Sequence, residues 1–146
     1  MRKITAVMLL LSAMFFSFDQ KAHVENIWWN GEKTSKIHIY KSADNTYYGK
    51  IVWLQKPNEA NGKPRTDLEN PNEKLRNRPL MDLVVLKDFK LSSSDKNVLE
   101  GGTIYDPNSG KTYCGKITYQ GKQLKLRGHI CGWSWLGRST TWELVE

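Results

Sequence analysis

Four charged side chains are the part of the sequence best suited to binding a ligand. Asp67, Arg76 and Arg78 lie in one polar segment, and Arg127 lies far downstream in an alternating apolar stretch. Guanidinium groups bind carboxylates and phosphates through paired hydrogen bonds, so the set predicts a clamp for an anionic group. The same four residues also suit an internal salt-bridge network that holds the polar segment down. The sequence leaves both interpretations open.

The stretch "YDPNSGKTY", residues 105–113, contains the Gly-Lys-Thr that closes a phosphate-binding P-loop. A P-loop needs a second glycine five positions before that Gly, and Tyr105 occupies the position. Pro107 instead presets the first central residue of a turn, Asp106 can accept a backbone hydrogen bond, and Gly110 suits a left-handed position. The stretch therefore predicts a turn between two strands.

Motifs for catalysis or metal binding do not occur in the sequence. His38 and His129 have no motif partner, Cys114 has no nucleophile signature, and no HExxH, paired CxxC or GxSxG is present. We therefore expect no catalytic residue, no metal ion and no cofactor. Enzymatic activity is left uncertain, and the sequence favours a protein without it.

Cys114 and Cys131 are the two cysteines of the chain, and a disulfide between them is one of two alternatives. A two-residue turn at 121–122 pairs Gln120 with Gln123 and places Cys114 opposite His129. Cys131 then lies two residues further along the same face, about 7 to 8 Å away on the diagonal. That distance is too long for a bridge unless a bulge shifts the register.

Short strands rather than helices must position these side chains. The strand candidates are bounded by Gly, Pro, Asn or Asp, and with a short strand at Trp28-Trp29 they number about eight; they read "SKIHIYK", "TYYGKIVWL", "DLVVLKDF", "NVLEGGTIY", "KTYCGKITY", "QLKLRGHI" and "STTWELV". Tight turns between short strands indicate an antiparallel meander, and closing it removes the exposed edges. We expect an all-β fold, a meander that closes into a small barrel.

One long polar segment interrupts the strands at residues 55–79. It contains four prolines and few large apolar side chains. Connections this long are uncommon in compact domains and are usually functional loops or disordered insertions. The segment is either a structured lid or a floppy insertion, with a short helical turn expected at residues 72–76.

The first 22 residues resemble a secretory signal peptide. A basic start precedes an apolar run to Phe18 that is shorter than the roughly 20 residues a membrane-spanning helix needs. We expect one domain over residues 23–146, exported to the periplasm or the outside of a bacterium, with no transmembrane segment after cleavage. Removing residues 1–22 lowers the formal charge from +7 to +5, with charges of both signs interspersed, which argues against a nucleic-acid partner.

Four segments together resemble the bacterial family called domain of unknown function 2147: "YYGKIVWL", "DLENPNEKLRNRPL", "EGGTIYDPNSGKTYCGK" and "LKLRGHI…LGRSTTW". The resemblance runs from Trp28 to Trp142, and it implies a small exported protein with no established reaction. Asp82 stands where this family commonly has Gly. The structural signature of the match consists of Trp28, Tyr105, Asp106, Pro107, Gly110, Gly128, Arg138 and Trp142.

A Trp on the first strand, with an Arg and a Trp near the last, is similar to the lipocalin and streptavidin plan, in which the chain ends meet at the barrel floor. By that analogy Arg138 stacks on Trp28 in a cation–π contact. Arg138 and Trp142 are then expected to lock the fold rather than to touch a ligand.

Three functions follow, in order of preference. The first is a non-enzymatic binding module for a small or envelope-associated ligand, because the six Trp and six Tyr could line an apolar pocket. The second is a structural or interaction protein of the cell envelope, without a cavity, whose loop meets a partner. The third is an envelope enzyme that acts on an anionic substrate through Asp67 and the arginines. The sequence does not specify the ligand, the partner or the oligomeric state.

Overall fold

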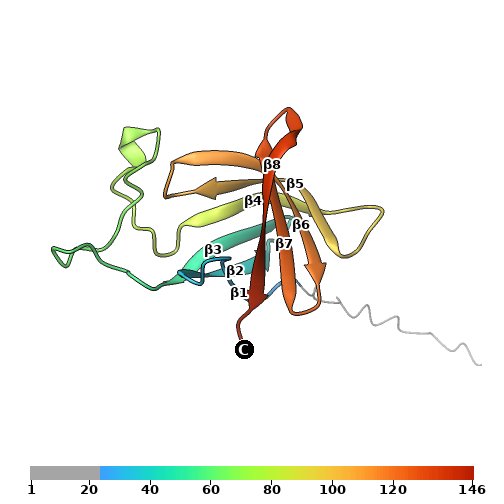
Figure 1. Cartoon of the computed structure of the whole chain (residues 1–146), viewed down its shortest axis with the longest axis horizontal. Coiled ribbons are helices and arrows are strands. Elements are labelled where there is room, and N and C mark those ends of the chain that lie inside the picture. Colours follow the sequence, from blue (N-terminus) through green and yellow to red (C-terminus); the bar gives the residue numbers. More distant parts are fainter. Residues whose placement is uncertain (1–23) are drawn as a thin grey trace, which may run out of the picture.

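Alternating apolar and polar side chains form strands that close into a barrel around one core. The computed structural model describes residues 24–146, in which each strand pairs antiparallel with the next and the last returns to the first (Figure 1). The elements are β1 (Ile27–Trp29), β2 (Ser35–Lys41), β3 (Tyr47–Leu54), the 3-10 turn η1 (Glu73–Leu75), β4 (Val84–Leu91), β5 (Val98–Asp106), β6 (Lys111–Gln120), β7 (Gln123–Ile130) and β8 (Trp133–Leu144). The predicted eight-stranded meander is confirmed.

The predicted signal peptide, residues 1–22, lies outside the described residues. Within residues 24–146, no helix has the length and apolar character needed to cross a membrane.

The up-and-down order places the connections at two ends of the barrel. We call one end the mouth; it carries the connections at residues 30–34, 55–83, 107–110 and 131–132. The opposite end, the base, carries the connections at residues 42–46, 92–97 and 121–122. The polar loop and the turn at 107–110 therefore lie at the same end.

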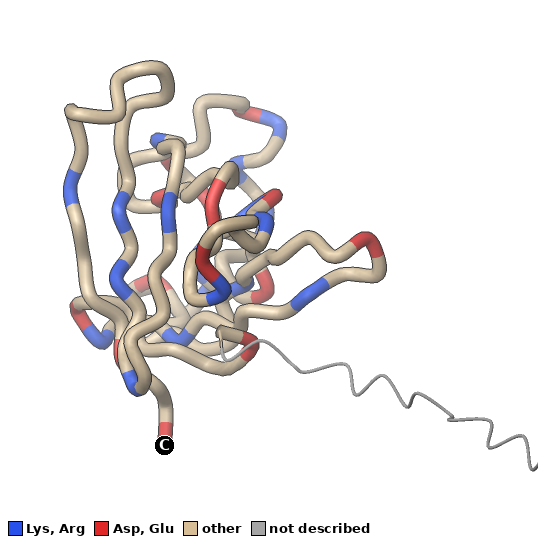
Figure 2. The backbone as a smooth tube through the Cα atoms, turned by 90° about the vertical axis from the view of Figure 1, so that its right-hand side faces the viewer, with Lys and Arg blue, Asp and Glu red and all other residues tan. Residues whose placement is uncertain are grey.

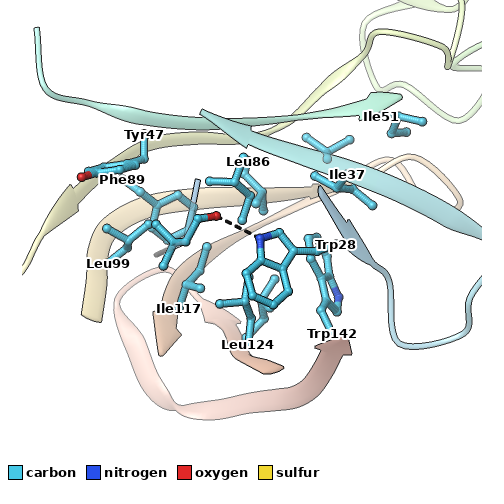
Figure 3. Close-up of a cluster of buried hydrophobic side chains, with 14 of the residues drawn as sticks. Trp28, Ile37, Tyr47, Ile51, Leu86, Phe89, Leu99, Ile117, Leu124 and Trp142 are labelled. Atoms are coloured by element: carbon cyan, nitrogen blue, oxygen red, sulfur yellow. Dashed lines mark hydrogen bonds between the residues drawn. The ribbon is translucent and has the colours of Figure 1, made fainter. Parts of the chain in front are cut away.

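The base half of the barrel is filled by large side chains that are almost completely buried (Figure 3). They are Trp28, Phe89, Leu99, Ile117 and Leu124. The indole Nε1 of Trp28 donates to the carbonyl oxygen of Val24 at 2.9 Å, so its polar atom is satisfied inside the core.

The expected stacking of Arg138 on Trp28 is wrong. Trp28 pairs with Leu144 near the base, whereas Arg138 is exposed and pairs with Gly128 towards the mouth. The analogy fails because β8 begins at Trp133, well before the predicted strand at 139–145, so Arg138 lies far from the end that meets β1.

The segment between β3 and β4 is an ordered, hydrogen-bonded loop. Of the two alternatives that the sequence left open, a structured loop and a floppy insertion, the structure has the first. Leu80 N donates to Arg65 O at 3.0 Å, and Asp67 N donates to Arg78 O at 3.0 Å. The predicted helical turn is present as η1, capped by the side chain of Asn72.

The turn at residues 107–110 packs against this loop. Gly110 N donates to Asp106 O at 2.8 Å, and Gly110 has a φ of 68°, so the predicted left-handed glycine turn is present. A Cβ on Gly110 would lie 1.9 Å from Glu69 O. Only glycine allows the two segments to approach so closely.

Cys114 and Cys131 form a disulfide with 5.0 Å between their Cα atoms. The predicted register is correct, since Gln120 pairs with Gln123 and Cys114 pairs with His129. The β6–β7 ladder ends at the Cys114–His129 pair, and the β7–β8 register shifts directly after His129, so the regular diagonal spacing does not extend to Cys131. The disulfide therefore ties the β7–β8 turn to β6.

Candidate functional site

Asp67 is the centre of a polar cluster at the mouth of the barrel. Its side chain is fully buried. Tyr105 Oη donates to Oδ1 at 2.5 Å, and Asn70 Nδ2 and Arg78 Nε each donate to Oδ2 at 2.8 Å. Arg78 Nη2 also lies 2.6 Å from Oδ2. The carboxylate thus ties the β3–β4 loop to the end of β5.

Burial and hydrogen bonding act in opposite directions on the pKa of Asp67. Burial raises this pKa, but the hydrogen bonds from Tyr105, Asn70 and Arg78 outweigh it, so the pKa lies below its usual value. Burial and the bond to Asp67 raise the pKa of Tyr105. At neutral pH Asp67 is therefore an ionised carboxylate whose two oxygens already have donors, which suits a structural role better than proton transfer.

The structure brings three of the four predicted charged residues together. Arg76 Nε donates to Asn70 O at 2.8 Å, and the Arg78 guanidinium lies 5.8 Å from the centre of the Tyr105 ring. Arg127 is not part of this cluster; its Nη2 donates to Ser134 O at 3.0 Å in the β7–β8 hairpin. The expectation that Arg127 joins Asp67 is wrong, because alternation with buried Leu126 places it on the outer face of β7.

Beside the cluster, a cavity of about 360 Å³ opens at the mouth. Its inner wall is apolar and is formed by Ile37, Ile51, Leu86, Ile104 and Trp142, several of which are drawn in Figure 3. Its rim is polar and includes Asn30, Thr34, Arg65, Tyr105, Asp106 and Asn108. The barrel is thus filled at its base and hollow at its mouth.

A wider groove of about 710 Å³ lies on the outer surface, where Tyr40 and Tyr48 face the loop residues Arg78 and Met81. It is shallow and open to solvent, so a molecule there would lose less contact with water than one inside the barrel. The cavity at the mouth is therefore the better candidate site.

Some residues of the cavity were not identified from the sequence. Arg65, Ile104 and Thr140 belong to no motif, and they meet only because the loop, β5 and β8 converge at the mouth. The alternation of inward positions is the one signal that could have located Ile104 and Thr140. Arg65 has no such signal, because the loop has no period.

Within residues 24–146, the cysteines and His38 have separate contacts. Both cysteines are in the disulfide, and His38 lies 5.7 Å from the ring of Tyr40. Among the described residues, no group of three or more His, Cys, Asp or Glu side chains is placed to hold a metal ion.

Comparison with known proteins places the chain in a family. The family model described as "Uncharacterized protein conserved in bacteria (DUF2147)" matches residues 25–143. No curated protein matches the chain. The solved structure of protein HP1028 from Helicobacter pylori, described as belonging to the lipocalin family, is 23% identical, with a TM-score of 0.71 over 86% of this chain and 85% of that one. The barrel is thus lipocalin-like in fold, and the chain belongs to the bacterial family DUF2147.

Proposed function

We propose that the barrel binds one small amphipathic molecule at its mouth, with the apolar part of the molecule against Ile37, Leu86 and Trp142. The observation that carries the proposal is the cavity of about 360 Å³ with an apolar wall and a polar rim. Ligand pockets typically have volumes of roughly 300 to 1,000 Å³, so the molecule would be small. Lipocalin-type barrels of eight strands are wide enough for one such ligand.

Arg65 indicates which polar group the ligand would carry. Its side chain is 33% exposed at the rim, and its Nε lies 3.7 Å from Glu59 Oε1, a long contact between partly exposed groups. A carboxylate or another acceptor on the ligand could replace Glu59 and bind the guanidinium through two hydrogen bonds. We therefore propose an apolar molecule with an anionic or hydrogen-bond-accepting end.

The Asp67 cluster supports this function indirectly. The loop contributes Arg65 and Leu80 to the cavity. Leu80 N donates to Arg65 O two residues along from the bond between Asp67 N and Arg78 O. The cluster therefore fixes the loop that completes the rim. In this proposal Asp67, Arg76 and Arg78 position the site, and Arg65 contacts the ligand.

Thr140 and Thr141 provide a matched pair of variants for testing the cavity. Both are exposed neighbours on β8, but Thr140 lines the cavity, whereas Thr141 pairs with Lys125 on the outer face. We expect Thr140→Trp to fill the mouth and weaken binding of anilinonaphthalene sulfonate, an aromatic anion, by roughly tenfold or more. Thr141→Trp should leave the affinity unchanged.

Fluorescence titration measures the affinity, and circular dichroism checks that both variants fold. Native mass spectrometry of protein recovered from its own cells would identify a retained ligand. Equal affinities in the two variants, or no binding of the probe and no retained molecule, would overturn the proposal and favour an interaction protein without a ligand.

We also propose that the chain is exported. The apolar segment that ends at Phe18 supports export, and a disulfide between Cys114 and Cys131 suits an oxidising compartment. Amino-terminal sequencing of protein from the envelope fraction tests this. A chain that still begins at Met1 and is recovered from the cytoplasm would contradict it.

A further inference from the structure

The β7–β8 hairpin presents an aromatic surface that the cavity does not use. Trp133 is 57% exposed and Trp135 is 75% exposed, and their rings are nearly parallel, with centroids 6.1 Å apart. Ile130 and Leu136 in the same hairpin are also exposed. A group of exposed apolar side chains of this kind marks an interaction surface more often than a solvated one.

Two contacts hold this hairpin in place. The disulfide attaches Cys131 to Cys114 on β6, and Arg127 donates to Ser134 O from the outer face of β7. These contacts therefore limit how far the hairpin can move to bury the indole rings against the barrel. A partner would bind them with little further loss of conformational freedom.

The strands below the hairpin form a basic outer face. No Asp or Glu occurs between Asp106 and Glu143, whereas this span contains six Lys and Arg residues, three of which lie on the outer face of β6 and β7. Lys116 and Arg127 are register partners, and both alternate with inward residues, as Lys125 does. Figure 2 shows Lys and Arg positions along these strands and an uncharged hairpin at their top.

These charges are available to a partner. Lys122 forms an ion pair with Glu146, but within residues 24–146 no carboxylate lies within ion-pair distance of Lys116, Lys125 or Arg127. Glu100 on β5 is the register partner of Lys116 and forms the acidic border of the face. The outer surface of β6–β8 is therefore complementary to an anionic surface.

We propose that the β7–β8 hairpin docks the protein on an anionic phospholipid bilayer. Trp133 and Trp135 enter the interfacial region, and Lys116, Lys125 and Arg127 contact the headgroups. Tryptophan is enriched at membrane interfaces, and basic side chains near it add attraction to anionic lipid. The hairpin projects beyond the barrel (Figure 1), and such a projecting tip suits a deformable lipid surface better than a rigid pocket.

Cosedimentation with vesicles tests the role of the tryptophans. The vesicles contain phosphatidylethanolamine and phosphatidylglycerol, with phosphatidylcholine vesicles as the neutral comparison. We expect Trp135→Ser to reduce binding to the anionic vesicles roughly tenfold, because the ring loses its apolar contact. Trp53→Ser is the matched control, since Trp53 is partly exposed on β3, away from the hairpin, and should bind as the unchanged protein does.

A second pair of variants tests the charges. Lys116→Gln with Lys125→Gln should reduce binding to anionic vesicles roughly tenfold or more, because each basic residue near the lipid contributes about fivefold. Lys87→Gln with Lys90→Gln removes the same charge from exposed positions of β4 and should have little effect. All variants keep the same amino-terminal segment, so differences between them report on the barrel.

Any of three binding results would overturn the proposal: equal binding to anionic and neutral vesicles, equal binding by the Trp135→Ser and Trp53→Ser variants, or equal binding by the two double-lysine variants. A fourth result, crosslinking from position 135 to a protein instead of lipid in the envelope, would also overturn it. Circular dichroism and an intact disulfide confirm that each variant is folded.

Discussion

At the scale of single residues, Asp67 combines full burial with a network of donors, and this makes it a target for substitution. Asp67→Asn removes the charge that Tyr105, Asn70 and Arg78 share. We expect the free energy of unfolding to fall by about 2 to 4 kcal/mol at neutral pH, because hydrogen bonds to a charged group are strong and Arg78 loses its partner. Urea denaturation measures the change.

Asp95→Asn is the control for this substitution. Asp95 is exposed and accepts a hydrogen bond from Asn97 N in the β4–β5 turn. The control should cost less than about 1 kcal/mol. An equal fall in the free energy of unfolding in the two variants would show that the hydrogen bonds around Asp67 do not contribute to stability.

The same residue predicts a pH dependence. The folded pKa of Asp67 is lowered, so its contribution to stability is present above the unfolded pKa, about 3.9, and is lost as the pH falls through the lower folded value. The difference in unfolding free energy between the unchanged protein and Asp67→Asn should therefore shrink below about pH 4. A difference that stays constant down to pH 2 would contradict this linkage.

The residues of this cluster could be predicted only in part. Asp67, Arg76 and Arg78 stood out because charged residues gather in one polar segment. Tyr105 did not stand out as their partner, because it is 38 residues from Asp67 and only the packing of the loop on β5 brings the two together. Sequence spacing carries no information about such a contact.

At the scale of elements, substitutions of Gly110 and Gly121 distinguish two reasons for a glycine: a left-handed backbone conformation, and a lack of space for a side chain. Their φ angles are 68° and 73°, but a Cβ at Gly110 meets Glu69 O, whereas a Cβ at Gly121 meets nothing within 4 Å. Gly121→Ala should cost about 1 to 2 kcal/mol through its left-handed conformation alone. Gly110→Ala should cost at least about 2 kcal/mol more, because the turn must move away from the loop.

Thermal and urea unfolding of both variants measure this difference. Equal destabilisation would mean that the 107–110 turn can move away from the β3–β4 loop with no loss in the free energy of unfolding.

Elements with regular alternation were predictable, and irregular ones were not. The strand "QLKLRGHI" was predicted with the bounds of β7, because Leu124 and Leu126 alternate with charged residues. The start of β8 was missed, because "CGWSWLG" has no clear period. Asp82 has a φ of 64°, a left-handed conformation that glycine adopts most readily, which fits the expectation that the family has Gly at this position. The sequence marks that position only by comparison with the family.

At the scale of the whole molecule, the contact between β1 and β8 is the weakest link in the closed sheet. β1 has three residues and pairs with β8 through Trp28–Leu144 and Trp29–Glu143, whereas β7 pairs with β8 along its whole length. We expect the amides that join β1 to β8 to exchange with solvent before those that join β6 to β7, because a short ladder opens locally at low cost. Hydrogen exchange followed by NMR or mass spectrometry tests this order.

The outcome that would contradict this order is equal exchange of both sets of amides, which would mean that the barrel opens only by global unfolding. Closure itself was predictable, since eight short strands in a meander leave two edges that pairing removes. The hollow mouth was not predictable, because the volume left inside depends on which side chains pack side by side across strands.

The pairing of the first and last strands also bears on chain connectivity. Val145 N donates to Ile27 O at 3.0 Å, so the two ends of the described chain lie side by side. A short linker could join them, and new termini could be opened in the exposed turn at residues 93–96 without breaking any strand pair. The barrel is therefore well suited to circular permutation, which would move the chain ends away from the strands that close the sheet.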